Sequence, residues 1–303
     1  MREAKKWRRT GVGIAAMSWL VAACGPPPVL DQLLVETATA GGFVPPARAE
    51  VDWAETLFAR LLQGDASPTV TQGLGALGFE VRPLGPPPAP LVVLEAVGRR
   101  VGKGTYVLRR HRTQPVVVLQ APHRFHDRGT GTIAARLFEE ANFAALAWNN
   151  VPRRYKEHGT AIDADLARLD VHYLTGFSSA VARSFPQARI VQLHGFEPRK
   201  RRSDAGSEAA VILSDGTKTP GPIVREVTTC LRSSFPDERV LLYPEDTSEL
   251  GGTTNRQGAA VRAAGSAGFL HLEMSSELRA LLQRSPEARA ALAGCLLAAG
   301  APS

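Results

Sequence analysis

Short apolar runs alternate with amphipathic segments from Pro115 to the C-terminal region of the chain. Runs of about four apolar residues are typical of buried strands, whereas apolar positions three and four residues apart indicate helices. The alternation predicts an α/β fold, with a largely parallel or mixed sheet and helices on both faces. The predicted strands cover 116–119, 190–193, 210–213, 240–243 and 269–274, and the predicted helices cover 131–147, 163–184, 222–234 and 286–299.

The segment before Pro115 contains a different set of elements. Residues 51–63, VDWAETLFARLLQ, place their large apolar side chains on one helical stripe. Two strand-like segments, LVVLEAV and GTYVLRRH, are joined by GRRVGKG, which predicts a hairpin. The GKGT within this turn lacks the spacing of a phosphate-binding loop. No internal repeat is present, so residues 51–303 are expected to form a single domain.

The N-terminus has the pattern of an export signal. The first nine residues, MREAKKWRR, carry five basic side chains and one acidic side chain, and an apolar run from Gly11 to Ala23 follows. This run is too short to span a membrane as a mature helix and is typical of a secretory signal over 1–23. Arg8-Arg9 leaves open the twin-arginine route, although Thr-Gly-Val follows the pair.

The residues at the end of the signal predict a lipid anchor. Val21-Ala22-Ala23-Cys24 resembles the bacterial lipobox, in which the cysteine is acylated. Cleavage as an ordinary signal, with an incidental cysteine, is the alternative. We therefore expect a protein held to the bacterial cell envelope through Cys24, and Gly25 is compatible with the periplasmic side of the outer membrane. The Pro- and Gly-rich residues 24–50 are predicted to be a tether.

The net charge gives little support to a nucleic-acid function. The formal charge is +7, but the first nine residues contribute +4 of it and leave +3 on residues 24–303. The remaining local excess is Arg199-Lys200-Arg201-Arg202, just after His194. This run is either a solvated loop or an anion-attracting rim.

Cysteine usage is consistent with an oxidising compartment. If Cys24 carries a lipid, Cys230 and Cys295 remain, and both lie in segments that are predicted to be helical. The sequence leaves open whether these two form a disulfide. With so few cysteines the fold must depend on a hydrophobic core, and about 255 residues are enough to build one.

Three predicted strands end in residues that can bind a metal ion. His123, His126 and Asp127 follow the first of them, His194 follows the second, and Glu273 lies in FLHLEM. Functional groups in open α/β sheets gather beyond the carboxyl ends of strands, so we expect these side chains to converge. Two imidazoles and one carboxylate can hold Zn²⁺ with its fourth position open, while a second carboxylate acts as general base. His271 alternates onto the face of Glu273 and could donate a hydrogen bond to the site.

The motifs APH…DRGTG, QLHG and HLEMSSELR, in that order, resemble the zinc carboxypeptidase-like superfamily over residues 95–300. The resemblance is nearest to its N-formylglutamate amidohydrolase and poly-γ-glutamate hydrolase branches. Carried over by position, it implies a zinc-dependent amidohydrolase or peptidase with His123, Asp127 and His194 as ligands and Glu273 as catalytic base. The peptidases have His-x-x-Glu, whereas Asp127 lies four positions after His123, so His126 is the alternative second ligand.

The resemblance also implies substrate-binding residues. AWNNVPRRY is similar to the Asn-x-x-x-Arg segment with which the family holds a substrate carboxylate, which points to Asn149 and Arg153, with Arg154 next to them. The planar guanidinium of arginine meets a carboxylate at two points. An ordinary surface turn is the alternative for this segment. Asn255, in GGTTNRQG, is a further candidate.

Two other functions compete with a zinc hydrolase. Ala264-Gly265-Ser266-Ala267-Gly268 approximates the nucleophile elbow of a serine hydrolase, but a helix precedes Ser266 and a strand follows it, the reverse of an elbow. A non-catalytic lipoprotein of the same fold, acting as a binding or scaffolding module, is the second. For the zinc enzyme, the expected location suggests peptidoglycan stem peptides, γ-glutamyl polymers or N-acyl amino acids as substrates. The sequence does not indicate an oligomeric state.

Overall fold

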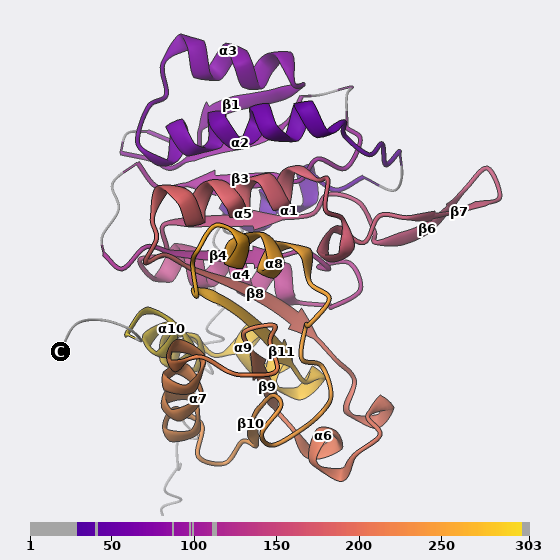
Figure 1. Ribbon diagram of the computed structural model, residues 1–303, viewed down its shortest axis with the longest axis vertical. Coiled ribbons are helices and arrows are strands. Elements are labelled where there is room, and N and C mark those ends of the chain that lie inside the picture. Colours follow the sequence, from indigo (N-terminus) through magenta and orange to yellow (C-terminus); the bar gives the residue numbers. More distant parts are fainter. Residues whose placement is uncertain are drawn as a thin grey trace, which may run out of the picture.

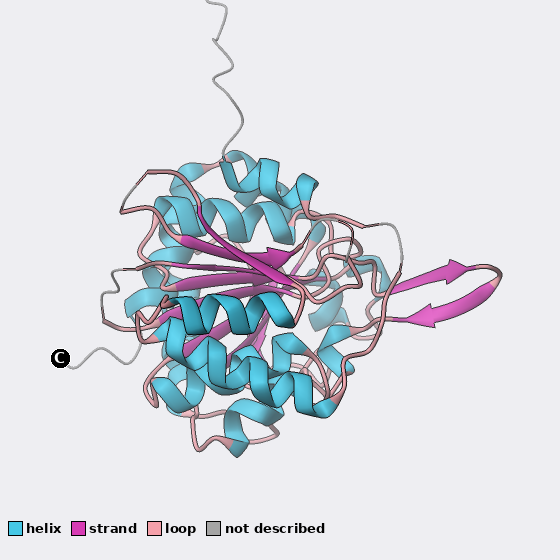
Figure 2. Ribbon diagram, turned by 90° about the horizontal axis from the view of Figure 1, so that it is seen from above, coloured by secondary structure: helices cyan, strands magenta, loops and turns pink. Residues whose placement is uncertain are grey.

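The computed structural model describes residues 29–39, 42–86, 88–96, 98, 100–110 and 114–298. One nine-stranded sheet runs through it, with helices on both faces (Figures 1 and 2). The expected signal over 1–23 and the lipid site Cys24 lie outside these residues. Of the helices described, none is long and apolar enough to cross a membrane. The sheet contains β1 (Phe79–Pro83), β2 (Leu91–Glu95), β3 (Thr105–Leu108), β4 (Val117–Ala121), β5 (Ala145–Trp148), β8 (Arg189–Gly195), β9 (Val211–Ser214), β10 (Val240–Leu242) and β11 (Phe269–Met274).

Four neighbouring strands at the centre of the sheet are parallel. The strand order is β1-β2-β3-β5-β4-β8-β11-β9-β10. β5, β4, β8 and β11 run in one direction, β1, β2 and β3 form antiparallel pairs up to β5, and β9 is antiparallel to β11. The predicted α/β fold is confirmed. Because the carboxyl ends of the four parallel strands meet at one edge, the residues after them share a region of space.

Two layers of helices bury the two faces of the sheet (Figure 2). Each layer rests on an apolar helical stripe packed against the β-branched and aliphatic residues of the strands. The first layer comprises α1 (Val29–Glu36), α4 (Thr130–Glu140), α7 (Pro222–Ser234), α9 (Ser276–Arg284) and α10 (Pro286–Ala298). The second comprises α2 (Arg48–Leu62), α3 (Pro68–Ala76), α5 (Tyr173–Ser184) and α8 (Arg256–Ala263).

A two-stranded hairpin projects from the body of the molecule (Figures 1 and 2). It is formed by β6 (Arg154–Glu157) and β7 (Thr160–Asp163), and its residues are half-buried or exposed. The short helices η1 (Leu166–Arg168), η2 (Pro198–Lys200) and α6 (Asp204–Glu208) lie in the connections that follow. The predicted 163–184 helix begins later, at Tyr173, because Asp163 ends β7 and residues 164–172 form the connection that contains η1.

The predicted helix over 131–147 is wrong in its second half. Helix α4 ends at Glu140, and residues 145–148, ALAW, form strand β5 between β3 and β4. All four residues of β5 are buried, so the strand shows no alternation of apolar and polar positions. Periodicity alone does not distinguish such a strand from the continuation of a buried helix.

The predicted tether over 24–50 is also wrong in part. Residues 29–36 form α1, and α2 already begins at Arg48. Leu30, Leu33 and Leu34 are buried against α4, and the backbone N–H of Leu30 donates a hydrogen bond to Glu139. Their spacing of three and four residues gives VLDQLLVE an apolar face, which the surrounding prolines and glycines obscured.

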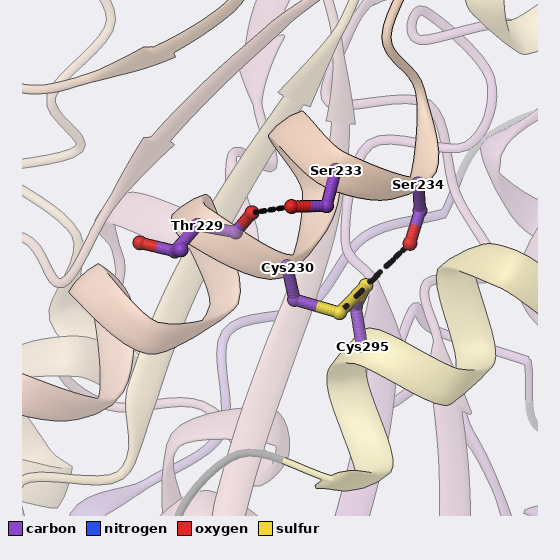
Figure 3. The surroundings of a disulfide bond; sticks show 5 residues. All are labelled: Thr229, Cys230, Ser233, Ser234 and Cys295. Carbon is purple, nitrogen blue, oxygen red and sulfur yellow. Dashed lines mark hydrogen bonds between the residues drawn. A yellow bond between two sulfur atoms is a disulfide. The ribbon is translucent and has the colours of Figure 1, made fainter.

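Cys230 of α7 and Cys295 of α10 form a disulfide, which settles the pairing that the sequence left open (Figure 3). Their Cα atoms are 5.5 Å apart and 65 positions separate them in the chain. The bond joins two helices of the same layer near the β9–β10 end of the sheet, against which α7 packs. A cross-link across so long a loop stabilises mainly by restricting the unfolded chain.

We expect the Cys230→Ser and Cys295→Ser double variant to unfold at lower urea concentration than the parent protein. Chain-entropy arguments place the loss in unfolding free energy at about 4 kcal/mol or less. Urea titration followed by circular dichroism, with and without reductant, measures it. A parent protein whose unfolding midpoint is indifferent to reductant would contradict the disulfide, and the double variant, which has no bond to reduce, controls for other effects of the reductant.

Candidate metal centre

Three side chains from two strand ends converge in a cleft at the carboxyl edge of the sheet. His123 and Asp127 follow β4, and His194 lies near the end of β8. The Nδ1 atoms of the two histidines are 3.2 Å apart, and Oδ2 of Asp127 lies 3.5 Å from Nδ1 of His123 and 3.4 Å from Nδ1 of His194. All three side chains are buried. The structure thus brings together the three residues that the motifs singled out as ligands.

The spacing of these three atoms fits a tetrahedral ion. Zinc bonds to nitrogen and carboxylate oxygen are about 2.0–2.1 Å long, which places tetrahedral ligand atoms about 3.3–3.4 Å apart. An octahedral Mg²⁺ site with bonds of similar length needs a separation of about 2.9 Å and prefers oxygen ligands. Two imidazole nitrogens and one carboxylate oxygen therefore match Zn²⁺ in both donor type and spacing.

A carboxylate that the sequence analysis missed determines which nitrogen of His123 faces the cleft. Nε2 of His123 lies 2.7 Å from Oδ1 of Asp165, a buried residue just before η1. A carboxylate only accepts hydrogen bonds, so Nε2 carries the proton and donates it. In the neutral imidazole, the lone pair of Nδ1 then points toward Asp127 and His194, as a metal ligand requires.

A buried network of amide side chains orients His194 in the same way. The Nε2 atom of Gln192 donates to Oε1 of Gln120 at 2.9 Å and to Oε1 of Gln257 at 3.0 Å, which fixes the orientation of the Gln192 amide. Its Oε1 accepts a hydrogen bond from Asn255 and lies 3.1 Å from Nε2 of His194. Nε2 of His194 must therefore donate, and its Nδ1 presents a lone pair to the cleft.

The network itself ends in groups whose hydrogen-bonding roles are fixed. The Nε2 atoms of the two outer glutamines donate to hydroxyl and backbone carbonyl oxygens, so neither amide can be reversed without loss of hydrogen bonds. These acceptors are Ser178 Oγ for Gln120, and Leu166 O and Thr175 Oγ1 for Gln257. All three glutamines are fully buried, so a reversed amide would leave polar atoms unsatisfied away from water.

The convergence of electron-rich atoms requires a positive charge. Burial opposes a charge on His123, but its hydrogen bonds to Asp127 and Asp165 outweigh burial and raise the pKa of His123. Burial also lowers the pKa of His194, so that ring favours the neutral form. Without a metal, a proton on His123 is the compensating charge. A divalent cation satisfies the same demand while using all three lone pairs.

Glu273 lies next to this group on β11, paired in register with His194. Its Oε1 is 3.9 Å from Nε2 of His271, too far for a hydrogen bond, and its Oε2 is buried without a hydrogen-bond partner. His271 instead stacks on His194, with ring centroids 4.3 Å apart. A carboxylate oxygen of Glu273, a ring nitrogen of His271 and one of His194 lie within 4.8 Å of one another.

Burial and the nearby charge of Asp127 raise the pKa of Glu273 to about 8. A cation bound by the His123 group would oppose this shift by attracting the carboxylate form. Glu273 is thus a buried carboxyl with a free oxygen, and one of its oxygens lies within 4.8 Å of a ring nitrogen of His194. Its protonation responds to the charge in the cleft. These are the properties of a general base.

The cleft has a volume of about 660 Å³ and a basic wall. Arg153 lies at the His123 side, with Nη1 3.3 Å from Nδ1 of His123. Its Nε is buried and has no hydrogen-bond partner. Several other basic side chains line the same cleft, namely Arg168, Lys200, Arg201 and Arg279.

The other predicted site residues are placed differently. His126 is exposed and lines the cleft, but it belongs to no metal-binding group of the described residues. Asn255 lines the cleft and contributes to the site through Gln192. Asn149 is buried, donates to Val151 O and does not line the cleft, while the side chain of Arg154 lies in the projecting hairpin, 61% exposed.

Ser266, the nucleophile of the competing serine-hydrolase interpretation, does not line the metal cleft. Ser266 lines a separate cavity of about 510 Å³ with Asp215, Arg262 and Phe269, and the lining of that cavity contains no histidine. Its Oγ accepts a hydrogen bond from the backbone N–H of Gly268. Helix α8 precedes Ser266 and strand β11 follows it, so the strand, turn and helix of a nucleophile elbow are absent there.

No family model and no curated protein matches the chain. Similar solved structures include an N-formylglutamate amidohydrolase from Ralstonia eutropha, 14% identical, with a TM-score of 0.41 and coverage of 64% of this chain and 96% of that one. A bacteriophage poly-gamma-glutamate hydrolase is 13% identical, with a TM-score of 0.35 and coverage of 63% and 86%. These two structures carry the names of the two branches that the sequence motifs resemble. The succinylglutamate desuccinylase of Chromobacterium violaceum is 15% identical, with a TM-score of 0.39 and coverage of 81% and 74%. The metal-binding and general-base properties described above belong to the side chains of this chain.

Replacing Gln192 by Met should weaken zinc binding by about 10- to 100-fold, because His194 loses the acceptor that fixes its tautomer. Competition with a chromophoric chelator measures the affinity. Gln257→Met is the matched control: it removes an equally buried amide of the network but leaves Gln192 in contact with His194. Equal zinc affinity of the two variants would show that Gln192 does not orient the ligand.

Proposed function

We propose that the chain is a zinc-dependent amide hydrolase acting on substrates with a carboxylate near the scissile amide. The observation that carries the proposal is the convergence of two imidazole nitrogens and one carboxylate oxygen at 3.2–3.5 Å, with both rings oriented by buried partners. His123, Asp127 and His194 would hold the ion. When bound, Zn²⁺ would supply a Lewis acid that polarises a carbonyl oxygen and makes water more acidic.

Glu273 performs the proton transfers in this proposal. Its unpartnered Oε2 accepts a proton from the water that attacks the amide carbon, and the carboxyl then delivers that proton to the departing nitrogen. Burial of Glu273 keeps bulk water from competing for this oxygen. Phe196, which is buried and lines the cleft beside His194, excludes solvent on the same side.

Arg153 binds the substrate carboxylate. Its guanidinium contacts Nδ1 of His123, whose lone pair would hold the zinc ion, so in the metal-bound protein Nη1 would be free of that contact. The freed fork then faces the cleft with several donors and no acidic partner at ion-pair distance among the described residues. Two parallel hydrogen bonds to a carboxylate fix both the position and the direction of the substrate.

The N-terminal pattern adds an envelope location to the proposal. With a lipid on Cys24, the chain would be anchored to the membrane and would act on substrates within the cell envelope. N-acyl amino acids, γ-glutamyl polymers and peptidoglycan stem peptides all combine an amide with a nearby carboxylate. The similar solved structures include an amidohydrolase, a hydrolase of poly-gamma-glutamate and a desuccinylase.

The purified protein is expected to contain close to one zinc per chain. His123→Ala and His194→Ala should lose it, because each removes one of three protein ligands. Elemental analysis of the parent and both variants measures the content, and circular dichroism verifies that the variants fold. A folded parent protein that neither contains nor takes up zinc would support a non-catalytic lipoprotein instead.

Glu273→Gln should keep the zinc and lower turnover by about 10²- to 10⁴-fold, because the amide is similar in shape but accepts no proton. Hydrolysis of N-acyl amino acids and peptidoglycan fragments, with and without chelator, gives the rates. Retention of full activity by the Gln variant would remove Glu273 from the mechanism.

Arg153→Gln should lower kcat/KM by about 10- to 100-fold on a substrate with a free carboxylate, through loss of charge-assisted hydrogen bonds. The same change should have little effect on the corresponding carboxamide, which has no charge for Arg153 to bind. Arg154→Gln, at the exposed neighbouring position, is the control and should leave both rates unchanged. An equal loss on both substrates would contradict carboxylate binding by Arg153.

A further inference from the structure

A second cavity adjoins the metal cleft. It has a volume of about 690 Å³, and it shares four lining residues with the cleft, namely His126, Glu197, Lys200 and Arg279. Arg153 does not line it. Because the cavities share a wall, a ligand that extends from the metal-binding group past the shared residues enters the second cavity, which we call the annex.

The lining of the annex is strongly basic. Besides the residues it shares with the cleft, it contains Arg128, Arg199, Ser276 and Gln283. Arg128, Arg199, Lys200 and Arg279 are cations, and Glu197 is the one acid in this lining. The cations come from three different parts of the chain, so they do not form a single solvated run. The annex therefore attracts anions into a concave surface.

Arg279 is built into the floor between the two cavities. It is 5% exposed, and its guanidinium lies over the backbone of Gly195, where a Cβ atom would be 1.6 Å from Nη1. A side chain at position 195 would therefore require the guanidinium of Arg279 to shift from this place. Gly195 pairs with Met274, the step after the His194 and Glu273 pair. Arg279 is thus held against Gly195, the residue after His194, which pairs with the residue after Glu273.

The protein satisfies only part of the hydrogen-bonding capacity of the Arg279 guanidinium. Its Nη1 donates to Met274 O at 3.4 Å and its Nη2 to Glu197 Oε1 at 3.2 Å, both at the long end of hydrogen-bond distances. The side chain of Glu197 is 44% exposed, so this ion pair is weak and open to competition from solvent. An incoming carboxylate could take the place of Glu197 and meet the fork at two points.

We propose that the annex binds a second acidic group of the substrate, a carboxylate on the acyl side of the scissile amide. This inference rests on the proposed function and sharpens it. In the strand order β5-β4-β8-β11, Arg153 follows β5, next to the strand that precedes His123, and Arg279 follows β11, next to the strand that carries His194. A substrate that reaches from one arginine past both histidines to the other carries a carboxylate on each half of the amide. Arg279 is the specificity-determining residue, and Arg128, Arg199 and Lys200 add attraction at longer range.

The test compares two ligands of almost equal shape, N-succinyl-L-alanine and N-succinamoyl-L-alanine, which differ by a carboxylate or a carboxamide at the end of the acyl group. Binding is measured by calorimetry to the full chain with Glu273→Gln, so that neither ligand is hydrolysed. A charge-assisted hydrogen-bond pair predicts about 10- to 100-fold tighter binding of the succinyl compound. Equal affinities for the two ligands would overturn the proposal.

Three further variants in the same background assign the preference to residues. Arg279→Gln should abolish the preference, whereas Arg202→Gln should not, since Arg202 belongs to the same basic run but lines neither cavity. Glu197→Gln should strengthen binding of the succinyl compound by a few fold, because it removes the competing carboxylate. A preference that survives in folded Arg279→Gln, or that weakens in Glu197→Gln, contradicts the role of the annex.

Failure of this inference is separable from failure of the proposed function. Zinc content and hydrolysis of N-acetyl-L-alanine, which has no acyl-side acid, test the hydrolase without the annex. A protein that binds zinc and hydrolyses this compound but does not distinguish the succinyl from the succinamoyl ligand keeps its function and loses the subsite. If Arg279→Gln does not fold, Glu197→Gln alone decides, because Glu197 is exposed and its replacement leaves the core intact.

Discussion

The crowding of three electron-rich atoms at adjacent strand ends is the constraint on which the site depends. Strands β4 and β8 are parallel neighbours, so the residues after them reach the same point in space. Two nitrogen lone pairs and a carboxylate oxygen within 3.5 Å repel one another unless a positive charge lies between them. The fold imposes this arrangement through backbone pairing, and a bound cation would relieve it, so folding and metal binding would be coupled.

A buried polar frame holds the crowded atoms in place. Asp165 and Gln192 each contact the far nitrogen of one imidazole, and Gln192 is itself held by two other glutamines and Asn255. Such a network costs desolvation energy, and a core of aliphatic side chains would be simpler to build. The network orients the two imidazole rings, because the same hydrogen bonds that satisfy the amides determine which nitrogen of each ring faces the cleft.

The sequence predicted the elements with a strong local pattern and missed features that depend on distant partners. Strand 269–274 and helix 222–234 match the structure at both ends, since each combines clear periodicity with turn residues at its boundaries. Strand β5 and helix α1 were missed because one lacks alternation and the other lies among prolines and glycines. Asp165 has no local signal, since its partner His123 is 42 positions away. Arg279 lies within HLEMSSELR, but its role emerges only from the close approach to Gly195.

The net charge of the chain and the charge of the residues that line the cleft have different consequences for binding. Beyond the first nine residues the net charge is only +3, which gives little support to a strong nonspecific attraction for polyanions, yet the cleft concentrates arginine and lysine around a buried anionic group. Within such a hollow, low-dielectric walls focus the field, so a few cations influence binding more than many on an open surface. Of the buried carboxyls, Asp127 and Asp165 favour the charged form, and without a bound cation they oppose the approach of an acid to the metal-binding atoms. For the proposed substrate, the basic residues that line the cleft and the annex would bind the two acidic ends, which would leave the neutral amide between them as the part that meets Glu273.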